Sequence, residues 1–415
     1  MSEFKVIRYL DGYELIMVSC WMNLRGEITL EDESTNAYEK LVKDLPAQLS
    51  KYRCGRLSIK SPASKPQFIE ACKPPRVIAV DWVDPAATAS VESYRMPPMD
   101  EWTEGEPLVV VHVAQRGKDV QLKVKASHTI CDGRTVEGIY RIVANVLDAS
   151  VPAPQDAPFP EFGQRSQFTM TDEEASQTPK IWPEVPRDMP IYPPIPDNAE
   201  PVNMNTYVRY EWEPLHKYCK EHGIGTQSVL MAAAARASRK YNKFPADTPI
   251  YVSVPGDSRR SIVATEEHAK REVFSGSSVV IVRDGGCEDA LSEIIECNNG
   301  MRATQKTPDI ALNITFFGGV VDKETGDFTP TDLYPTGPNC PIVLVSNVGV
   351  YKFVKNPRLF CALPGRGGSI SIYSYASGPA LEVFIIHPKG LDKALIDATV
   401  AEMDEIIGAA GSKRC

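Results

Sequence analysis

The sequence lacks the long apolar segments and terminal signals that would attach a protein to a membrane. Its longest early apolar run, Leu15 to Met22, includes Ser19 and Cys20 and is far shorter than the roughly 20 residues that span a bilayer. The N-terminus has no signal-peptide layout, and the final cysteine does not form a CaaX box. We therefore expect a cytoplasmic protein without a membrane span.

Cysteine pairs and an excess of positive charge are also missing. The ten cysteines are scattered, with no CxxC pair and no zinc-ligand spacing, so we expect reduced thiols and no metal site. Acidic residues exceed basic ones, 54 to 45, which gives a net charge of −9. This balance argues against a general nucleic-acid binder, which needs a basic face.

What is present is an ordinary globular composition, with 43% hydrophobic and 24% charged residues in a chain of 415. At about 150 residues per domain, this length predicts two domains or one large two-lobed domain. Prolines are concentrated between residues 151 and 201, and proline breaks both helices and strand ladders. We therefore predict an N-terminal lobe at 1–150, a proline-rich connection at 151–204 and a C-terminal lobe at 205–415.

Hydrophobic periodicity predicts strands and helices in both lobes. The predicted strands are Leu15–Met22, Arg76–Val83, Leu108–Ala114, Val208–Trp212, Pro249–Val254, Ser277–Val282, Pro341–Val345, Gly368–Tyr375 and Leu381–Ile386. The predicted helices include residues 37–45, Thr226–Tyr241 and Asp392–Ile407. This mixture indicates an α/β or α+β sandwich.

The segment from Val120 to Leu147 is the most informative for chemistry. Apolar and polar residues alternate from Val120 to Ser127, which predicts a half-buried strand, and His128 continues the apolar parity at its end. Asp132 and Gly133 then form a tight turn before a helix. A histidine held in this way can act as a general base near neutral pH. Asp132 could contact His128 or pair elsewhere and brace the loop, and a purely structural histidine is the alternative.

Residues 128–133, HTICDG, resemble the HxxxDG motif of the chloramphenicol-acetyltransferase-like superfamily of CoA-dependent acyltransferases. This superfamily includes alcohol acyltransferases, plant BAHD acyltransferases, peptide-synthetase condensation domains and dihydrolipoamide acyltransferases. Four further segments resemble family segments in the expected order. They are Leu49–Leu57 (ending GRL), Val254–Arg259 (VPxDxR), Ser346–Gly349 (SNLG) and, loosely, Tyr375–Ile385.

The sequence also departs from parts of the family pattern. Ser127 stands where many members have a second histidine, which weakens a condensation-domain or wax-ester-synthase assignment. The BAHD segment DFGWG is absent, and Gly276-Ser277 stands in place of a common GN pair. None of these departures removes the proposed base.

The resemblance implies two similar lobes, each a mixed β-sheet packed with helices, with the active-site tunnel between them. His128 would lie in this tunnel and deprotonate the acceptor, which attacks the thioester without an acyl-enzyme. Ser346 and Asn347 are the oxyanion candidates, so we expect Ser346 to approach His128 across the lobe interface. A serine that only caps a turn is the alternative.

The same resemblance implies structural roles around the motif. The aspartate that matches Asp132 usually pairs with an arginine, and Arg56 and Arg259 are the candidates. Asp257 and Arg259 could instead pair locally and hold the end of a strand. Gly133 would support the turn, because glycine permits backbone angles that other residues avoid.

These observations lead to one functional hypothesis and two alternatives. We predict an acyl-CoA-dependent O- or N-acyltransferase of secondary metabolism, acting as a monomer on a small alcohol or amine. Acyl-CoA, for example acetyl-CoA, would be a co-substrate, with no permanently bound cofactor. The alternatives are a carrier-protein-dependent, condensation-like enzyme and a non-catalytic binding protein on the same fold.

Overall fold

The structure is a computed structural model of the 415-residue chain. It describes residues 4–10, 14, 17–18, 20–60, 65–83, 91–95, 102–154, 202–245, 248–257, 275–282, 289–306, 320–321, 325, 328–329, 342–362, 370–388 and 390–415. Arg259 and most of the proline-rich connection lie outside the described residues.

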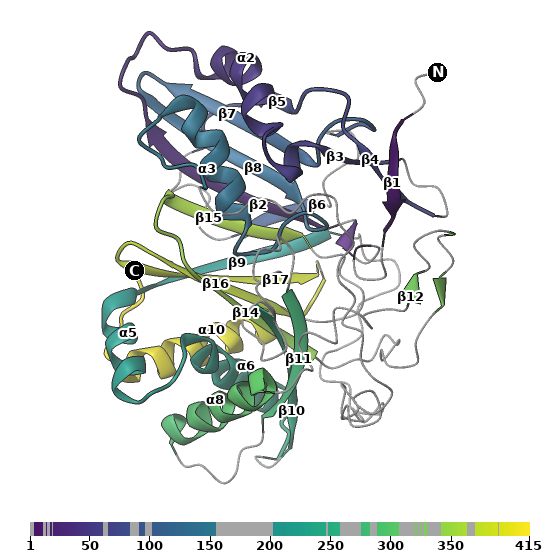
Figure 1. Cartoon of the computed structure of the whole chain (residues 1–415). Helices are drawn as coiled ribbons and strands as arrows, with labels where there is room; N and C mark the ends of the chain where they lie inside the picture. The colour runs from purple at the N-terminus through teal and green to yellow at the C-terminus, as the bar shows by residue number, and fades with distance from the viewer. Residues whose placement is uncertain are drawn as a thin grey trace.

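The first lobe is built on a five-stranded sheet with strand order β15-β2-β8-β7-β5 (Figure 1). Its strands are β2 (Trp21–Thr29), β5 (Arg76–Ala79), β7 (Val109–Arg116), β8 (Asp119–Ser127) and β15 (Lys355–Ala362). The pairings are antiparallel except for β5 with β7. Helices α2 (Ala37–Leu49) and α3 (Val136–Leu147) pack on one face of this sheet.

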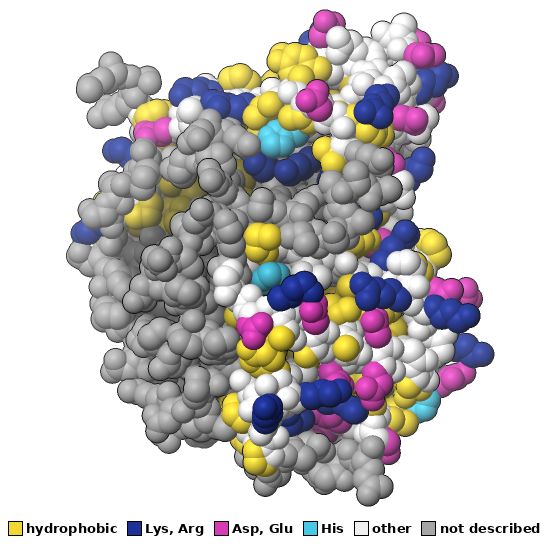
Figure 2. All heavy atoms as spheres, turned by 180° about the vertical axis from the view of Figure 1, so that it is seen from behind, with side chains coloured by type: hydrophobic (Ala, Val, Ile, Leu, Met, Phe, Trp, Pro, Cys, Tyr) yellow, Lys and Arg dark blue, Asp and Glu magenta, His cyan; other side chains and the backbone are white. Residues whose placement is uncertain are grey.

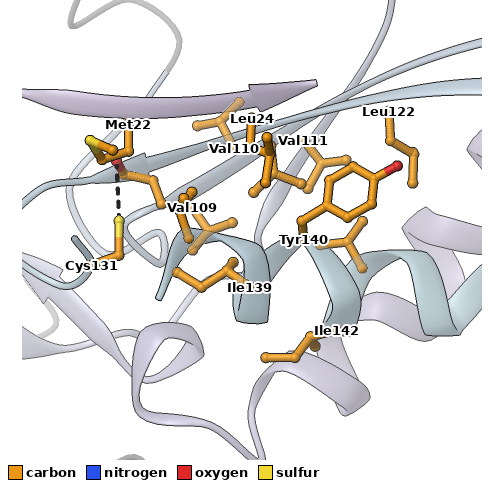
Figure 3. Packing of buried hydrophobic residues seen from close by; sticks show 14 of the residues in the cluster. Met22, Leu24, Val109, Val110, Val111, Leu122, Cys131, Ile139, Tyr140 and Ile142 are labelled. Carbon is orange, nitrogen blue, oxygen red and sulfur yellow. Dashed lines mark hydrogen bonds between the residues drawn. The ribbon is translucent and has the colours of Figure 1, made fainter. Parts of the chain in front are cut away.

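Apolar side chains fill the space between these helices and the sheet (Figure 3). Leu24 and Leu122 from the strands meet Ile139 and Tyr140 from α3, and all four are fully buried. A smaller sheet, β1 (Val6–Tyr9), β4 (Gln67–Glu70) and β3 (Leu57–Ile59), follows the order β1-β4-β3. The short 3₁₀ helix η1 (Arg53–Gly55) precedes β3.

The second lobe contains a seven-stranded sheet with strand order β11-β10-β14-β16-β17-β9-β6. Its strands are β6 (Val91–Arg95), β9 (Val202–Glu211), β10 (Ile250–Asp257), β11 (Ser275–Val282), β14 (Ile342–Val350), β16 (Ser371–Ser377) and β17 (Ala380–Pro388). β14 runs parallel to β10 and β16, and the other pairings are antiparallel. The short strands β12 (Val320–Val321) and β13 (Phe328–Thr329) pair separately.

In the described part of the chain, helices α5 (Trp212–Glu221), α6 (Thr226–Asn242), α8 (Ala290–Lys306) and α10 (Lys393–Ala409) accompany this second sheet (Figure 1). The alanine-rich α6 packs against α8 and α10, because small side chains allow helices to approach closely. None of the described helices is both long and apolar enough to cross a membrane.

The two lobes exchange strands. β15 follows β14 in the chain, but it pairs with β2 in the first sheet. β6 belongs to the first half of the chain, but it pairs with β9 in the second sheet. The predicted fold class, two lobes each with a mixed sheet packed with helices, is confirmed, whereas neither exchanged strand was predicted.

Two local predictions were wrong. The strand predicted at Leu15–Met22 begins only at Trp21 and continues to Thr29, where alternate residues face the helices. β8 was predicted to be half-buried, but both its parities are buried from Val120 to Leu122 and from Val124 to Ser127. One reason is that the Gln121 amide bonds to both backbone groups of Val83, so this segment covers the second face of the sheet.

The surface seen from behind carries charges of both signs (Figure 2). Lys and Arg side chains are interspersed with Asp and Glu over its described part. Exposed i,i+4 pairs on the described helices include Lys393 with Asp397 (2.6 Å) and Lys217 with Glu221 (3.9 Å). Such exposed pairs add little stability, about 0.3–0.5 kcal/mol each, but they support solubility.

Candidate active site

The ends of two strands fix the backbone of His128. β8 ends at Ser127, whose N–H donates to the carbonyl of Leu108 (3.0 Å). The N–H of His128 donates to the carbonyl of Cys20 (2.8 Å), just before β2 begins. The histidine is therefore held where β8 leaves the sheet, and it is only partly buried.

The residue before the histidine is a structural part of the turn. Ser127 is fully buried, and its hydroxyl lies 2.8 Å from that of Thr129. It also accepts the N–H of Thr129 (3.3 Å). This serine, in place of the second histidine of many superfamily members, thus stabilises the backbone next to His128.

Asp132 organises the loop that leads into α3. Its Oδ1 accepts hydrogen bonds from the N–H of Arg134 (3.1 Å), the N–H of Thr135 (3.0 Å) and the Thr135 hydroxyl (3.1 Å). The hydroxyl of Thr135 in turn accepts the N–H of Asp132 (2.8 Å). Such turns satisfy backbone donors that a helix start leaves without partners. These bonds support the bracing role of this carboxylate.

Neither candidate arginine for Asp132 is settled by the contacts described. The Arg56 carbonyl accepts the N–H of Ala71 (2.9 Å), and the pairing of the Arg56 side chain with Asp132 stays a prediction. Arg259 lies outside the described residues, so its pairing with Asp132 or Asp257 stays a prediction. The described partner of Asp257 is Arg134, with 2.8 Å between Oδ2 and Nη1.

This Arg134–Asp257 pair joins the motif loop of the first lobe to the end of β10 in the second. The Arg134 side chain is 58% exposed, so the pair contributes little to stability. It nevertheless shows that the VPxDxR-like segment approaches the HxxxDG-like segment.

Gly133 lies directly against β14 of the second lobe. A Cβ atom at this position would lie 2.9 Å from Cγ2 of Val348, and the carbonyl of Gly133 accepts the Tyr351 hydroxyl (2.8 Å). Gly133 is not among the glycines with positive φ. Close approach of β14, and not an unusual backbone angle, is therefore the reason for glycine here.

Ser346 and Asn347 lie on opposite faces of β14. Leu344 and Val348 pack with the first-lobe core, whereas Val343 and Val345 belong to the second-lobe core. Because side chains alternate along a strand, Ser346 shares the face of Val348, which touches the motif loop. It lies two residues from Val348, or roughly 7 Å along the strand.

Asn347 points away from that face, and its Oδ1 accepts the N–H of Gly349 (2.8 Å). This bond stabilises the end of the SNVG segment. The geometry favours Ser346 over Asn347 as an oxyanion donor, and the approach of Ser346 to His128 stays a prediction.

Comparisons with known proteins identify solved structures that have a similar fold. No protein-family model and no curated protein matches the sequence, but solved structures do. Trichothecene 15-O-acetyltransferase TRI3 from Fusarium sporotrichioides has a TM-score of 0.65 at 10% identity, over 97% of this chain and 94% of its own. TRI101 from the same organism, complexed with coenzyme A and T-2, has a TM-score of 0.60 at 10% identity, over 98% and 99%.

Polyketide synthase associated protein 5 from Mycobacterium tuberculosis has a TM-score of 0.60 at 14% identity, over 97% and 98%. These matches run along nearly the whole of each chain. The chain adopts the chloramphenicol-acetyltransferase-like fold. The resemblance that the motifs suggested is thus confirmed at the level of the fold.

In this chloramphenicol-acetyltransferase-like fold, a charge cluster around the buried Glu382 joins the two sheets away from the motif. Glu382 of β17 lies 3.2 Å from Nε of Arg209 and 3.3 Å from Nη1 of Arg358, and Arg358 comes from the exchanged strand β15. The Arg358 guanidinium also stacks over the Tyr207 ring at 4.4 Å.

Hydrogen bonding in this cluster is incomplete, because Glu382 Oε2 and Arg209 Nε have no hydrogen-bond partner among the described residues. Burial therefore dominates and raises the pKa of Glu382 to about 8.

Sequence reasoning missed the residues that connect the lobes at the motif. The Tyr351 hydroxyl contacts the motif loop, Glu137 of α3 accepts the N–H groups of Lys352 and Phe353, and Val348 packs on Gly133. The only indication of these residues in the sequence was their position next to SNVG or HTICDG. Cys131 is buried, and its thiol donates to the carbonyl of Ser127 (3.4 Å) and more weakly to that of Ala126 (3.8 Å; Figure 3), as suits a packing residue.

Proposed function

We propose that the protein is an acyltransferase that moves an acyl group from acyl-CoA to the hydroxyl or amine of a small molecule. Its fold is that of TRI3, a trichothecene 15-O-acetyltransferase, and of TRI101, which was crystallised with coenzyme A. The observation that carries the proposal is the contact between the two motifs: Val348 of the SNVG segment packs on Gly133 of HTICDG.

In this mechanism His128 accepts the proton of the acceptor hydroxyl or amine. The acceptor heteroatom then attacks the thioester carbonyl, and the oxygen of the tetrahedral intermediate receives a hydrogen bond from Ser346. The carbon–sulfur bond breaks, and the CoA sulfur takes the proton from His128. Alignment of both substrates by the protein replaces a covalent acyl-enzyme.

The experiment is a mass-spectrometric screen of acyl-CoAs of different chain lengths against pooled alcohols and amines. We expect an acylated acceptor and an equal amount of free CoA. His128→Ala should lower the rate by about 10²–10⁴-fold, the usual worth of general-base catalysis.

His222→Ala is a suitable control, because this histidine is exposed at the end of α5, where its Nδ1 lies 2.9 Å from the Tyr218 carbonyl. It should transfer acyl groups like the wild type. Equal rates for His128→Ala and wild type would refute the proposed base. A parallel reaction with an acyl carrier protein as donor tests the condensation-like alternative, and transfer from that donor alone would replace the CoA proposal.

A further inference from the structure

A short connection passes from the second lobe to the first beside the motif. Residues 351–354 link β14, which carries Ser346, to the exchanged strand β15. Tyr351 is buried, and its N–H donates to the carbonyl of Ala376 in β16 (2.9 Å). The backbone of Tyr351 therefore belongs to the second sheet, while its side chain reaches the first lobe.

The Tyr351 hydroxyl contacts the motif directly. It donates to the carbonyl of Gly133 (2.8 Å), and its ring packs on Tyr375 with centroids 5.0 Å apart. Burial, with the nearby charges of Glu137 and Asp132, holds the pKa of this hydroxyl well above its usual value. The phenol therefore remains a hydrogen-bond donor near neutral pH.

The rest of the connection is attached to α3. Glu137, in the first turn of α3, accepts the N–H groups of Lys352 and Phe353, each at 3.1 Å. The Arg141 guanidinium lies 4.2 Å from the centre of the Phe353 ring. Two backbone bonds and one cation–π contact thus fix the connection, so that the Tyr351 hydroxyl meets Gly133 in one position.

We propose that Tyr351 is a positioning residue, which holds the His128–Gly133 turn against β14 through the carbonyl of Gly133. The inference rests on the proposed function, in which His128 and Ser346 act on the same thioester from different lobes. A shift of about 1 Å in such an arrangement can lower a rate about 100-fold. The hydroxyl sets this distance, whereas the ring only fills space.

The test compares Tyr351→Phe with Tyr375→Phe. Both changes remove one buried hydroxyl and keep the ring, and the Tyr375 hydroxyl faces β15, where it donates to the carbonyl of Pro357 (2.7 Å) and accepts the N–H of Leu359 (3.3 Å). We expect Tyr351→Phe to lower kcat about 10- to 100-fold with little change in KM for acyl-CoA. Tyr375→Phe should lose at least as much thermal stability and keep the wild-type kcat.

A second measurement needs no substrate. The chain has six histidines, and the ring ¹⁵N signals of His128 can be assigned by NMR through their loss in His128→Gln. In Tyr351→Phe these signals should shift or broaden, while in Tyr375→Phe they should stay in place.

An unchanged kcat in Tyr351→Phe, or unchanged His128 signals, would overturn the positioning role. If the wild type itself transfers no acyl group, the proposed function fails, and the NMR comparison still decides whether Tyr351 positions the turn.

Discussion

The contact between Gly133 and Val348 leads to a sharp prediction. In Gly133→Ala the new methyl group would meet the Val348 methyls at 2.9 and 3.1 Å, closer than side chains normally approach. Valine is β-branched and has few rotamers to escape into, so β14 or the motif loop must move. Overpacking of this kind costs about 1–3 kcal/mol.

Gly138→Ala is a matched control in the same helix–loop unit. Its Cβ would lie 3.5 Å from the nearest atom, Cγ of Pro154, which is ordinary contact. Because Gly138 is inside α3, alanine should stabilise the helix there by up to about 1 kcal/mol. Chemical denaturation should therefore shift in opposite directions for these two glycine-to-alanine changes.

A double-mutant cycle tests whether contact with Val348 causes the destabilisation in Gly133→Ala. Val348→Ala alone should cost about 1–2 kcal/mol for the lost apolar contact. It should also remove most of the penalty of Gly133→Ala when the two changes are combined. If Gly133→Ala stays equally destabilising in the Val348→Ala background, the glycine is required by the backbone, and our account of the lobe contact is wrong.

Three further predictions concern the polar groups. Asp132→Ala should lose about 1–3 kcal/mol in denaturant melts, because Oδ1 accepts three hydrogen bonds in the turn, whereas Asp132→Asn keeps an oxygen that can accept them and should lose less. Ser346→Ala should lower kcat by up to about 10²–10³-fold, whereas Asn347→Ala should chiefly lower the melting temperature. A large loss of kcat in Asn347→Ala, with kcat unchanged in Ser346→Ala, would assign the oxyanion role to Asn347 instead. Since burial raises the pKa of Glu382 to about 8, protonation of this carboxyl stabilises the fold below about pH 4.5, and that stabilisation is lost as the pH rises through 8. Relative to Glu382→Gln, the wild type should lose up to about 1.4 kcal/mol per pH unit in this window, and a constant difference would mean that the carboxylate stays charged.

The sequence predicted those helices and strands whose composition is recognisable within a short stretch of the chain. Helix α6 and strands β7 and β17 lie close to their predicted ranges, because each is a run of residues typical of its element, alanines in the helix and mostly valine and other apolar residues in the strands. His128 follows the last strand residue, as the alternation before it indicated. The α/β or α+β class followed from the mixture of these elements, and the arrangement in two similar lobes followed from the family resemblance.

Contacts between segments far apart in the chain left no comparable pattern in the sequence. β15 contains Pro357 and Arg358 and does not show a regular alternation, so its partnership with β2, more than 300 residues away, could not be read from its sequence. From the sequence, no role was assigned to Glu382, which is buried among apolar residues of β17. Its burial follows from the lobe interface, which a single strand does not encode.

The strand exchange places a physical limit on how far the lobes can separate at the motif. β14 ends at Val350 in the second sheet, and β15 begins at Lys355 in the first, so the chain between them can span at most about 18 Å. β15 pairs with β2, and β2 pairs with β8 up to Ser127, the residue before His128. A continuous path of one short connection and two strand pairings therefore leads from Ser346 to His128. Opening the lobes at this point would break the ladder between β15 and β2, so any motion that admits substrates should open the molecule elsewhere along the lobe interface.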